Sequence, residues 1–541
     1  MPSDCLSFRD TTYFSSLICD YLDKHSHLKP FYHRFPTLEN FKSQIEEKQL
    51  SVRARSLSGV EMESRTVLVN SLKKQYQGVE MSQLTSDNIN ALQHDNTFTV
   101  TTGHQLNLFT GPLYFFYKIV STINLCKELK AEYPAYNFVP VYWMATEDHD
   151  FEEINYFNFN GKKIQWNRSS AGAVGELDLE GLEDVLKVFA TQLGLSANAK
   201  TLLQLFKDAY LNHTSLTDAT RYLVNELLKI NGLVIIDGND VELKRLFIPY
   251  IKDELVKQEA FKLVNETNEQ LNTVSTNYKI QVTPREINLF YLHNHQRERI
   301  VEMDGKYSVF GTNISWSQTE ILSEVEEFPE RFSPNVILRP LYQEVILPNL
   351  CYIGGGGEIA YWLQLKSNFE AKSVPFPILL LRNSALIITQ KQQEKLDKLQ
   401  VSVADLFLNQ DDLMTKVTKQ LSSINIDFSE QKAHLKKQFE GLYALAEQTD
   451  KSFKGAVAAQ EVKQIKGLEN LEKRLLKAQK RKLEGMLERV RQLQDELFPR
   501  QSLQERNANF SEFYLEYGEH FTQLLLQNLQ PLKSEFLILT V

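Results

Sequence analysis

Apolar positions before residue 390 follow two alternating spacings. Three nearly continuous apolar runs lie at residues 138–144, 233–236 and 376–381, and a short run rich in β-branched residues lies at 98–102. Between them, apolar residues recur three and four positions apart, which is typical of helices, whereas the continuous runs are typical of strands buried on both faces. This alternation predicts a Rossmann-like, doubly wound parallel α/β sheet. We expect two more strands at 335–340 ("NVILRP") and 350–358 ("LCYIGGGGE").

Two segments within this pattern have strand spacing of another kind. Asn160-Gly161 and Asp304-Gly305 are two-residue turns between segments with strand-like spacing, and such turns are typical of β-hairpins. We interpret both segments as β-rich insertions that connect parts of the α/β core.

The C-terminal part of the chain predicts long helices. Leu476, Leu483, Val490 and Leu497 repeat every seven residues, with Lys and Arg between them, which indicates a coiled coil. An antiparallel helical hairpin is the expected form. The expected domains are an N-terminal helical segment (1–92), the first half of the core (93–153), a hairpin insertion (154–214), a helix-strand-helix part of the core (215–265), a second insertion (266–332), the second half of the core (333–388), the coiled-coil arm (389–505) and a C-terminal return to the core (506–541).

Composition and charge limit the class of protein. A chain of 541 residues suggests three or four domains. Lys and Arg number 60 against 69 Asp and Glu, a net charge of −9, so overall attraction to nucleic acid is not expected. The basic run at 473–492 ("KRLLKAQKRKLEGMLERVRQ") fits the solvated face of a coiled coil better than an RNA-binding patch. No signal peptide or membrane span is recognisable, which predicts a cytoplasmic protein.

The first candidate site is the turn after residue 102. Gly103, His104 and Gln105 are followed by Thr110, Gly111 and Pro112 at the mouth of a predicted helix. Glycines let a backbone approach phosphate closely, and the amides of a helix N-terminus attract anions. We therefore predict an anion or nucleotide site there. The alternative is a plain glycine turn with a surface histidine.

The second candidate site closes the next strand. Glu147, Asp148, His149 and Asp150 could hold Mg²⁺ or supply a general base for an attacking amine. The alternative is a solvated turn whose acids cap the next segment. The chain has no HxxxH or HExxH pattern, so we expect no dedicated zinc site.

The third candidate site is a run of glycines. Gly354, Gly355, Gly356 and Gly357 precede Glu358 between a predicted strand and helix, and so many glycines carry a large entropic cost that a plain loop would seldom need. A ligand pressed against the run is the expected reason. Glu358 could bind an amine or complement the helix dipole. Further binding candidates, several of them at predicted strand ends, are Asp237, Arg339, Tyr361, Trp362, Arg382, Asn383 and Ser384.

Three long motifs resemble one protein family. "TTGHQLNLFTGPLYFFYKI", "VPVYWMATEDHDFEEIN" and "LRPLYQEVILPNLCYIGGGGEIAYWLQLK" occur in the order found in the BshC family of bacillithiol biosynthesis, the cysteine ligases. The resemblance extends through the whole chain, including the coiled coil. Where this chain has His104 and Gly356, the family pattern often has glutamine and proline.

The resemblance implies a core like that of class I aminoacyl-tRNA synthetases and nucleotidyltransferases, with a coiled coil used in dimerisation. The segment 102–112 would take the place of the synthetase "HIGH" signature, and Arg382-Asn383-Ser384 the place of "KMSKS", although neither signature is present literally. The implied reaction joins the carboxyl group of cysteine to the amine of glucosaminyl-malate.

Amide formation from a free carboxylate is uphill in water, so we expect activation by ATP or another nucleotide with Mg²⁺. The phosphates would lie against the turn from Gly103 to Pro112, and Gly354–Glu358 with Tyr361 and Trp362 would line a substrate pocket. The candidate catalytic residues are His104, Gln105, Asp148, His149 and Asp150. Two alternatives remain: another adenylate-forming or nucleotidyl-transferring enzyme, and a non-catalytic scaffold built on the coiled coil.

Overall fold

The computed structural model describes residues 4–56 and 60–541. By its internal contacts the chain forms two units. The larger consists of residues 5–385 and 504–537, and the smaller of residue 4 with 386–503 and 538–541. The C-terminal segment thus returns to the larger unit before the chain ends.

A five-stranded parallel sheet is the centre of the larger unit. Its order is β13-β12-β2-β3-β6, and every adjacent pair is parallel. The strands are β2 (Thr97–His104), β3 (Asn137–Met144), β6 (Val234–Asp237), β12 (Asn349–Gly354) and β13 (Ile378–Leu381). Along the chain, the first strand of this sheet is the central strand β2. Strands β3 and β6 then add to one side of it, and β12 and β13 add to the other side. The switch point lies between β2 and β12, where open α/β sheets bind ligands.

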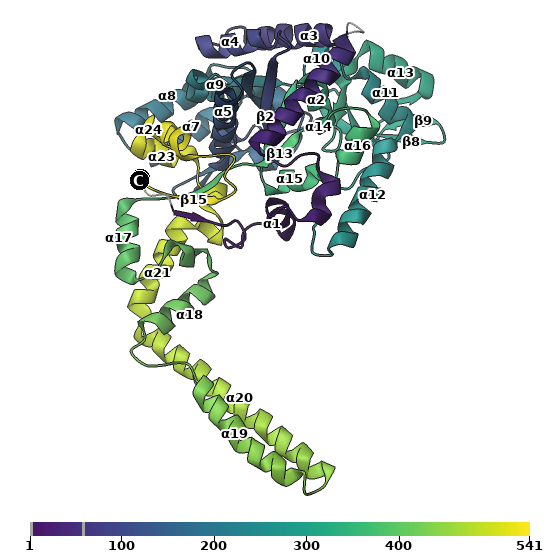
Figure 1. Ribbon diagram of the computed structural model, residues 1–541. Helices are drawn as coiled ribbons and strands as arrows, with labels where there is room; N and C mark the ends of the chain where they lie inside the picture. Colours follow the sequence, from purple (N-terminus) through teal and green to yellow (C-terminus); the bar gives the residue numbers. More distant parts are fainter. Residues whose placement is uncertain (1–3, 57–59) are drawn as a thin grey trace. The chain divides into compact units, whose positions relative to one another are not determined.

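The sheet is buried on both faces, and its buried side chains include the four threonines of β2 as well as apolar residues. All eight residues of β2 are buried, and α5 (Tyr114–Glu132) packs along β2 and β3 (Figure 1). Helix α2 (Leu38–Ser56) contributes Phe41 and Ile45 to the same core cluster as Phe98 of β2 and Leu350 of β12. The remaining helices before β7 are α1 (Ser16–Leu22), α3 (Val60–Gln75), α4 (Gln83–Ala91), α6 (Phe151–Ile154), α7 (Leu182–Leu193), α8 (Ala197–Leu211), α9 (Leu216–Leu228), α10 (Val241–Arg245), α11 (Ile248–Lys257) and α12 (Glu259–Val274).

Both predicted hairpins are confirmed. Strands β4 (Tyr156–Phe159) and β5 (Lys162–Gln165) pair across Asn160-Gly161, and β8 (Gln296–Met303) and β9 (Lys306–Val309) pair across Asp304-Gly305. All four turn residues have positive φ, as the tightest hairpin turns require. The second hairpin belongs to a sheet that also contains β7 (Leu289–His293), β10 (Ser315–Ser317) and β11 (Phe332–Pro334).

The strand expected at 335–340 was wrong. Asn335 accepts backbone hydrogen bonds from Ile337 (2.8 Å) and Leu338 (3.3 Å), and helix α14 (Arg339–Ile346) follows directly. Pro340 lies in its first turn, where the missing N–H costs little. Arg339 therefore begins a helix instead of ending a strand. The sequence misled because a short apolar run fits a buried helix as well as a strand.

Short elements complete the larger unit. They are α13 (Gln318–Glu327), α15 (Gly356–Trp362), α16 (Lys366–Ala371), α22 (Gln504–Asn507), α23 (Phe510–Tyr517) and α24 (His520–Asn528). Helices α23 and α24 pack on α8 and α5. Strands β1 (Asp4–Leu6), β14 (Ser384–Ile388) and β15 (Phe536–Thr540) form a three-stranded sheet, of which only residues 5–6, 384–385 and 536–537 belong to the larger unit.

The smaller unit contains the expected antiparallel helices, but not one continuous heptad helix. Helices α19 (Ser429–Ala446) and α20 (Lys451–Lys482) lie side by side (Figure 1), around a cluster of Phe439, Ala446 and Val457. Leu483 interrupts the heptad path between α20 and α21 (Glu484–Leu497). Helix α21 packs on α17 (Gln390–Leu399) and α18 (Gln410–Leu421) instead.

Candidate active site

The first and third candidate clusters come together at the switch point of the sheet. Gly103 and His104 end β2, Gly354 ends the neighbouring β12, and Arg382 follows β13. The backbone N–H of Arg382 donates to the Gly354 carbonyl at 2.9 Å. Residues remote in sequence are thus held at one edge by strand pairing.

A buried lysine that we did not predict lies between these clusters. Lys118, on α5, has a side chain only 4% exposed, and its Nζ lies 2.5 Å from Oε2 of Glu358 and donates to the Gly103 carbonyl at 2.8 Å. Tyr352 donates to Oε1 of the same carboxylate at 2.6 Å. Burial opposes the charge on Glu358, but the attraction of Lys118 outweighs it and holds the pKa of this carboxyl below its usual range. The signal available in the sequence was a single lysine inside the apolar helix "YFFYKIV".

Arg339 adds a second positive charge beside the end of β2. Its guanidinium donates to the Tyr361 hydroxyl at 3.2 Å and to Oε1 of Gln343 at 3.1 Å. A Cβ at Gly103 would lie 3.3 Å from the Tyr352 hydroxyl and 3.8 Å from Nη1 of Arg339. Glycine at position 103 therefore lets these polar groups approach the strand closely.

His104 is buried beside these cations with a free ring nitrogen. Its imidazole packs against Tyr114 and Phe115, and within the part of the chain that the structure describes, Nε2 has no hydrogen-bond partner. Burial, then the positive charges of Lys118 and Arg382, hold its pKa well below the usual range. A neutral imidazole with a spare nitrogen is suited to hydrogen bonding a ligand.

This burial predicts a pH dependence of stability. In the unfolded chain His104 binds a proton below pH about 6.5, whereas in the folded protein it stays neutral. The free energy of unfolding should therefore fall as pH decreases from 6.5 to 5, by up to ~1.4 kcal/mol per pH unit from this group. In His104→Gln that slope should be smaller by the same amount. Denaturant unfolding of both proteins at pH 7, 6 and 5 measures it, and equal slopes would contradict the prediction.

Gln105 joins the first cluster to the second. Its amide donates to Oδ2 of Asp148 at 2.8 Å and to Oε2 of Glu153 at 2.9 Å. Asp148 also accepts the backbone N–H of His149 at 2.7 Å. The cluster after β3 is therefore contiguous with the end of β2.

The four residues of the second cluster differ in their freedom to react. Glu147 is paired with the buried Lys244, so this carboxylate is not available as a metal ligand. His149 is 44% exposed at its side chain, and its Nδ1 accepts a hydrogen bond from Arg297 at 2.8 Å. Asp150 is exposed. His149 and Asp150 are thus the most exposed members, and Asp148 is half-buried, with 24% of its side chain exposed.

Asp237, at the end of β6, forms hydrogen bonds that hold the turn next to this cluster. It accepts the Thr146 hydroxyl at 2.5 Å and the backbone N–H of Asn239 at 2.8 Å. Burial raises the pKa of its carboxyl. These bonds fix the turn that carries residues 147–150.

The turn before α5 does not form the expected phosphate cradle. Asn509 of the C-terminal segment donates to the carbonyls of Phe109 (2.9 Å) and Gly111 (2.6 Å), and the N–H of Leu113 donates to the Ala508 carbonyl at 2.8 Å. Thr110 is buried and Pro112 half-buried in the same turn. Of these groups only the Leu113 N–H could donate to a phosphate, and Ala508 accepts it. The N–H groups of Thr110 and Gly111 donate within the turn, to the carbonyls of Asn107 (3.1 Å) and Leu108 (2.9 Å). The sequence could not reveal a contact about 400 positions away.

Gly111 is required by this closed turn. Its φ is +62°, and a Cβ would lie 2.6 Å from Cβ of Asn107. Gly111→Ala should lower the free energy of unfolding by at least about 1–3 kcal/mol, the cost of a strained backbone. Gly161→Ala is the matched control, because Gly161 also has positive φ (+74°) but an added Cβ meets nothing within 4 Å. Equal losses in the two variants, measured by tryptophan fluorescence in denaturant, would rule out the contact with Asn107.

The remaining predicted residues have mainly supporting positions. Trp362 is fully buried and stacks on Tyr352 at 4.5 Å between ring centroids, so it does not line an open pocket. Asn383 and Ser384 are also buried. Gly355 donates its N–H to Glu358 at 2.8 Å, while a Cβ at Gly356 or Gly357 would approach Ile18 (3.5 Å) or Gln281 (3.9 Å).

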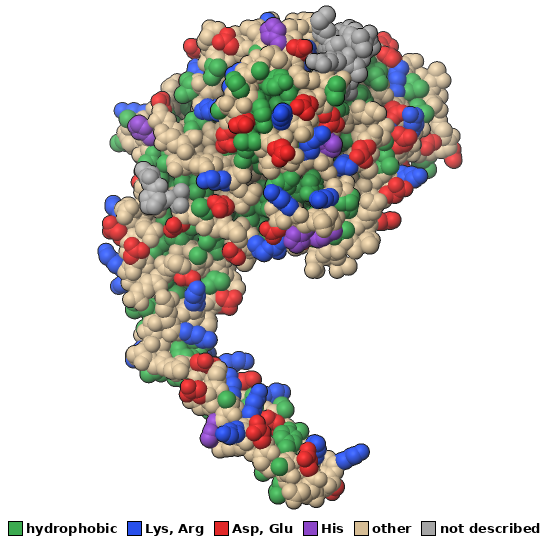
Figure 2. All heavy atoms as spheres, viewed as in Figure 1, with side chains coloured by type: hydrophobic (Ala, Val, Ile, Leu, Met, Phe, Trp, Pro, Cys, Tyr) green, Lys and Arg blue, Asp and Glu red, His purple; other side chains and the backbone are tan. Residues whose placement is uncertain are grey.

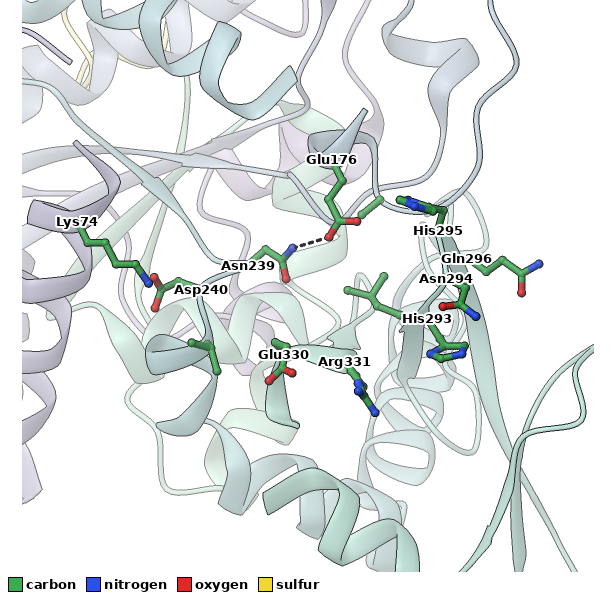
Figure 3. Close-up of a pocket in the computed structure, with 13 residues that line it drawn as sticks. Lys74, Glu176, Asn239, Asp240, His293, Asn294, His295, Gln296, Glu330 and Arg331 are labelled. Atoms are coloured by element: carbon green, nitrogen blue, oxygen red, sulfur yellow. Dashed lines mark hydrogen bonds between the residues drawn. The ribbon is translucent and has the colours of Figure 1, made fainter. Parts of the chain in front are cut away.

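A polar cavity of about 460 Å³ lies beyond the end of β6. Figure 3 shows Lys74 and Asp240 on one side and His293, Asn294 and Gln296 on the other. Lys244 connects the cavity wall to the second cluster, because it contacts Glu147 and donates to the carbonyl of Glu330 at 3.3 Å. Side chains of both charge signs suit a ligand rich in hydroxyl and carboxylate groups.

Comparison with known proteins identifies the family. Residues 1–383 match the family described as "Bacillithiol biosynthesis BshC, N-terminal Rossmann-like domain", and residues 385–541 match "Bacillithiol biosynthesis BshC, C-terminal coiled-coil domain". The chain belongs to the BshC family. The two matched ranges meet at residues 383–385, next to the boundary between the two units at residues 385–386.

Relatives of this BshC chain match along nearly their whole length. One from Flavobacterium johnsoniae is 60% identical over 541 residues, 100% of both chains. One from Flavobacterium psychrophilum is 58% identical over 539 residues, 100% of this chain and 99% of its own. One from Cytophaga hutchinsonii is 38% identical over 526 residues, 97% of this chain and 96% of its own. Each is named "Putative cysteine ligase BshC". Among the described residues, no helix combines the length and apolar character needed to cross a membrane.

Proposed function

We propose that this chain is a ligase that joins the carboxyl group of cysteine to the amine of glucosaminyl-malate, the last step of bacillithiol biosynthesis. The membership in the BshC family supports the pathway, and the names of the relatives support the ligase class. The observation that carries the proposal is the group of Lys118, Arg339, Arg382 and His104 at the switch point, where Nε2 of His104 has no hydrogen-bond partner among the described residues. Such a group suits an anionic substrate.

Nucleotide activation of the cysteine carboxylate is part of the proposal. The strand order supports a core of the class I synthetase and nucleotidyltransferase kind. Within the described residues, Nε2 of His104 and Nε of Arg382 are buried polar atoms without a partner, so both could hydrogen bond a phosphoryl or carboxylate oxygen. Residues 508 and 509 hydrogen bond to the turn before α5. We therefore propose that the anion binds at Gly103 and His104 and not at Gly111. Mg²⁺ would need carboxylates other than Glu147, such as Asp148 and Asp150.

The amine would be deprotonated beside the second cluster. Arg297 donates to Nδ1 of His149, so a neutral ring carries its proton on Nε2, and His149 would accept the amine's proton at Nδ1, in place of the bond from Arg297. Asp148 is the other candidate base, held in place by Gln105. We propose that the sugar and malate groups occupy the polar cavity beyond β6, which adjoins this cluster through Lys244.

Thiol profiling by mass spectrometry tests the proposal. Cells without this gene should lack bacillithiol and accumulate glucosaminyl-malate; wild type and the surface variant His520→Ala should restore bacillithiol, and His149→Ala should not. The purified chain should form bacillithiol from cysteine and glucosaminyl-malate only with a nucleotide. Formation without nucleotide would exclude the activation step. Nucleotide turnover with an acid other than cysteine would indicate a different adenylate-forming enzyme.

We also propose that the smaller unit mediates a homodimer. Leu442, Leu445, Phe453, Val462 and Leu471 are large apolar side chains at least 41% exposed on α19 and α20, and Figure 2 shows apolar side chains between charged ones on the visible face of this hairpin. Replacing Val462 and Leu471 with glutamate should convert a dimer to a monomer in sedimentation velocity at micromolar concentration. Lys466→Ala, on the same helix, should remain dimeric. A monomeric wild type would exclude the homodimer.

A further inference from the structure

A cluster of metal-ligating side chains lies outside the candidate active site. Asp20 on α1, His25 just after that helix and His27 in the short 3₁₀ helix Ser26–Phe31 each offer a ligand atom, and these atoms lie within 4.8 Å of one another. Asp20 is half-buried, and both histidines are exposed. Figure 2 shows histidine side chains gathered on the surface by α1. The cluster is thus preassembled and open to solvent.

The residue types indicate which ions would bind. Two imidazoles and one carboxylate are typical ligands of Zn²⁺, Co²⁺ and Ni²⁺, whereas Mg²⁺ and Ca²⁺ prefer oxygen alone. Nδ1 of His25 lies 3.8 Å from Oδ1 of Asp20. Two ligands of one tetrahedral ion at about 2.0–2.2 Å lie roughly 3.3 Å apart. His25 and Asp20 are therefore within about half an ångström of this separation, and the third ligand, within 4.8 Å of the others, needs a shift of at most roughly 1.5 Å.

Neighbouring groups already orient the carboxylate. Tyr278 donates to Oδ2 of Asp20 at 2.6 Å and lies 3.0 Å from Nε2 of His27. Hydrogen bonds of this kind around a ligand are a regular feature of metal sites. Tyr278 belongs to the segment after α12, so the cluster spans two separate parts of the chain.

Arg9 is the group that opposes a cation. Its Nη2 lies 2.8 Å from Oδ1 of Asp20, and also 2.6 Å from Oδ2 of Asp23. The guanidinium is half-exposed, so it can keep the bond to Asp23 when an ion takes Asp20. Arg9 therefore competes with the ion without preventing its binding.

We propose that Asp20, His25 and His27 bind one divalent cation of the Zn²⁺ class. The ion would fasten α1 to the 3₁₀ helix next to Tyr278. Helix α1 and the segment that contains Tyr278 both lie next to the glycine run at the start of α15. Ile18 of α1 lies beside Gly356, and Gln281, three residues after Tyr278, lies beside Gly357. The site would thus stabilise these segments beside the candidate active site, independently of the ligase reaction.

Co²⁺ is the first probe, because its visible absorption bands report tetrahedral coordination. The full chain, metal-free and without a polyhistidine tag, should bind one Co²⁺ that Zn²⁺ displaces. In His25→Asn/His27→Asn the bands should disappear and the affinity for Zn²⁺ should fall by at least about 100-fold, since even outer groups of a metal site cost 10–100-fold. His33→Asn/His520→Asn is the matched control and should bind as wild type does. Absent bands in wild type, or equal binding by both double variants, would overturn the proposal.

Two further measurements separate binding from folding. Without metal, wild type and His25→Asn/His27→Asn should unfold at the same temperature, because both histidines are exposed; excess Zn²⁺ should raise the unfolding temperature of wild type only. Arg9→Gln should tighten Zn²⁺ binding, because it removes the competitor for Asp20. Unchanged or weaker binding in Arg9→Gln would exclude Asp20 as a ligand.

Discussion

Lys118→Met should reduce the ligase rate at least 100-fold and lower the free energy of unfolding of the larger unit by about 3–5 kcal/mol. The stability loss follows because the Glu358 carboxylate, whose side chain is 26% exposed, would lose the buried cation 2.5 Å away. Removing one partner of a largely buried ion pair leaves an uncompensated charge. The rate loss, about 2.7 kcal/mol in barrier, follows if the ammonium group helps bind an anionic substrate beside Gly103. Initial rates and denaturant unfolding measure the two effects.

A second substitution separates these two roles of Lys118. In Lys118→Met/Glu358→Gln the buried charge is gone, so much of the lost stability should return. The ligase rate should stay low, since no cation remains at that position. Recovery of the rate together with stability would show that Lys118 only maintains the fold. Lys127→Met is the control on the same helix, where the side chain is exposed, and should change neither quantity much.

Tryptophan fluorescence gives a clean readout for the larger unit. All four tryptophans, Trp143, Trp166, Trp316 and Trp362, belong to it. The two units need not unfold together, so a signal confined to one of them avoids mixing two transitions. Circular dichroism, dominated by the helices of both units, would then report any separate unfolding of the smaller unit.

The sheet could be predicted from the sequence because burial on both faces leaves a simple pattern. The apolar runs at 138–144, 233–236 and 376–381 and the β-branched run at 98–102 each contain or overlap a strand of the parallel sheet. The run at 335–340 failed because Asn335 and Pro340 favour a helix start that competes with its apolar character. Local chemistry decided that segment, and hydrophobic spacing did not.

Only those residues of the candidate site that lie at the ends of strands could be predicted from the sequence. Gly103, His104 and Gln105 were located by the rule that ligands bind at the carboxyl ends of strands. The role of Lys118 depends on a contact between α5 and the start of α15, and the closed turn depends on Asn509. Neither contact leaves a pattern in the sequence, because it involves side chains that are adjacent only after folding.

Arg382→Met should lower the free energy of unfolding of the larger unit by about 3–5 kcal/mol, as a second buried ion pair would be broken. Nη2 of Arg382 lies 2.7 Å from Oε1 of Glu505, with side chains only 4% and 0% exposed. Glu505 also accepts hydrogen bonds from Ser384 (3.2 Å) and the N–H of Ala385 (3.3 Å). The pair therefore joins the end of β13 to the returning C-terminal segment.

The double variant Arg382→Met/Glu505→Leu tests whether this pair stabilises the fold or the site. Replacing both charges with apolar groups is often neutral or stabilising, so the variant should recover most of the lost stability. Its ligase activity should remain low, because Arg382 also carries an unpartnered Nε among the described residues and lies 4.9 Å from the ring centroid of Tyr114, beside His104. Full activity in this variant would remove Arg382 from the anion site and leave Lys118 and Arg339 to bind the substrate.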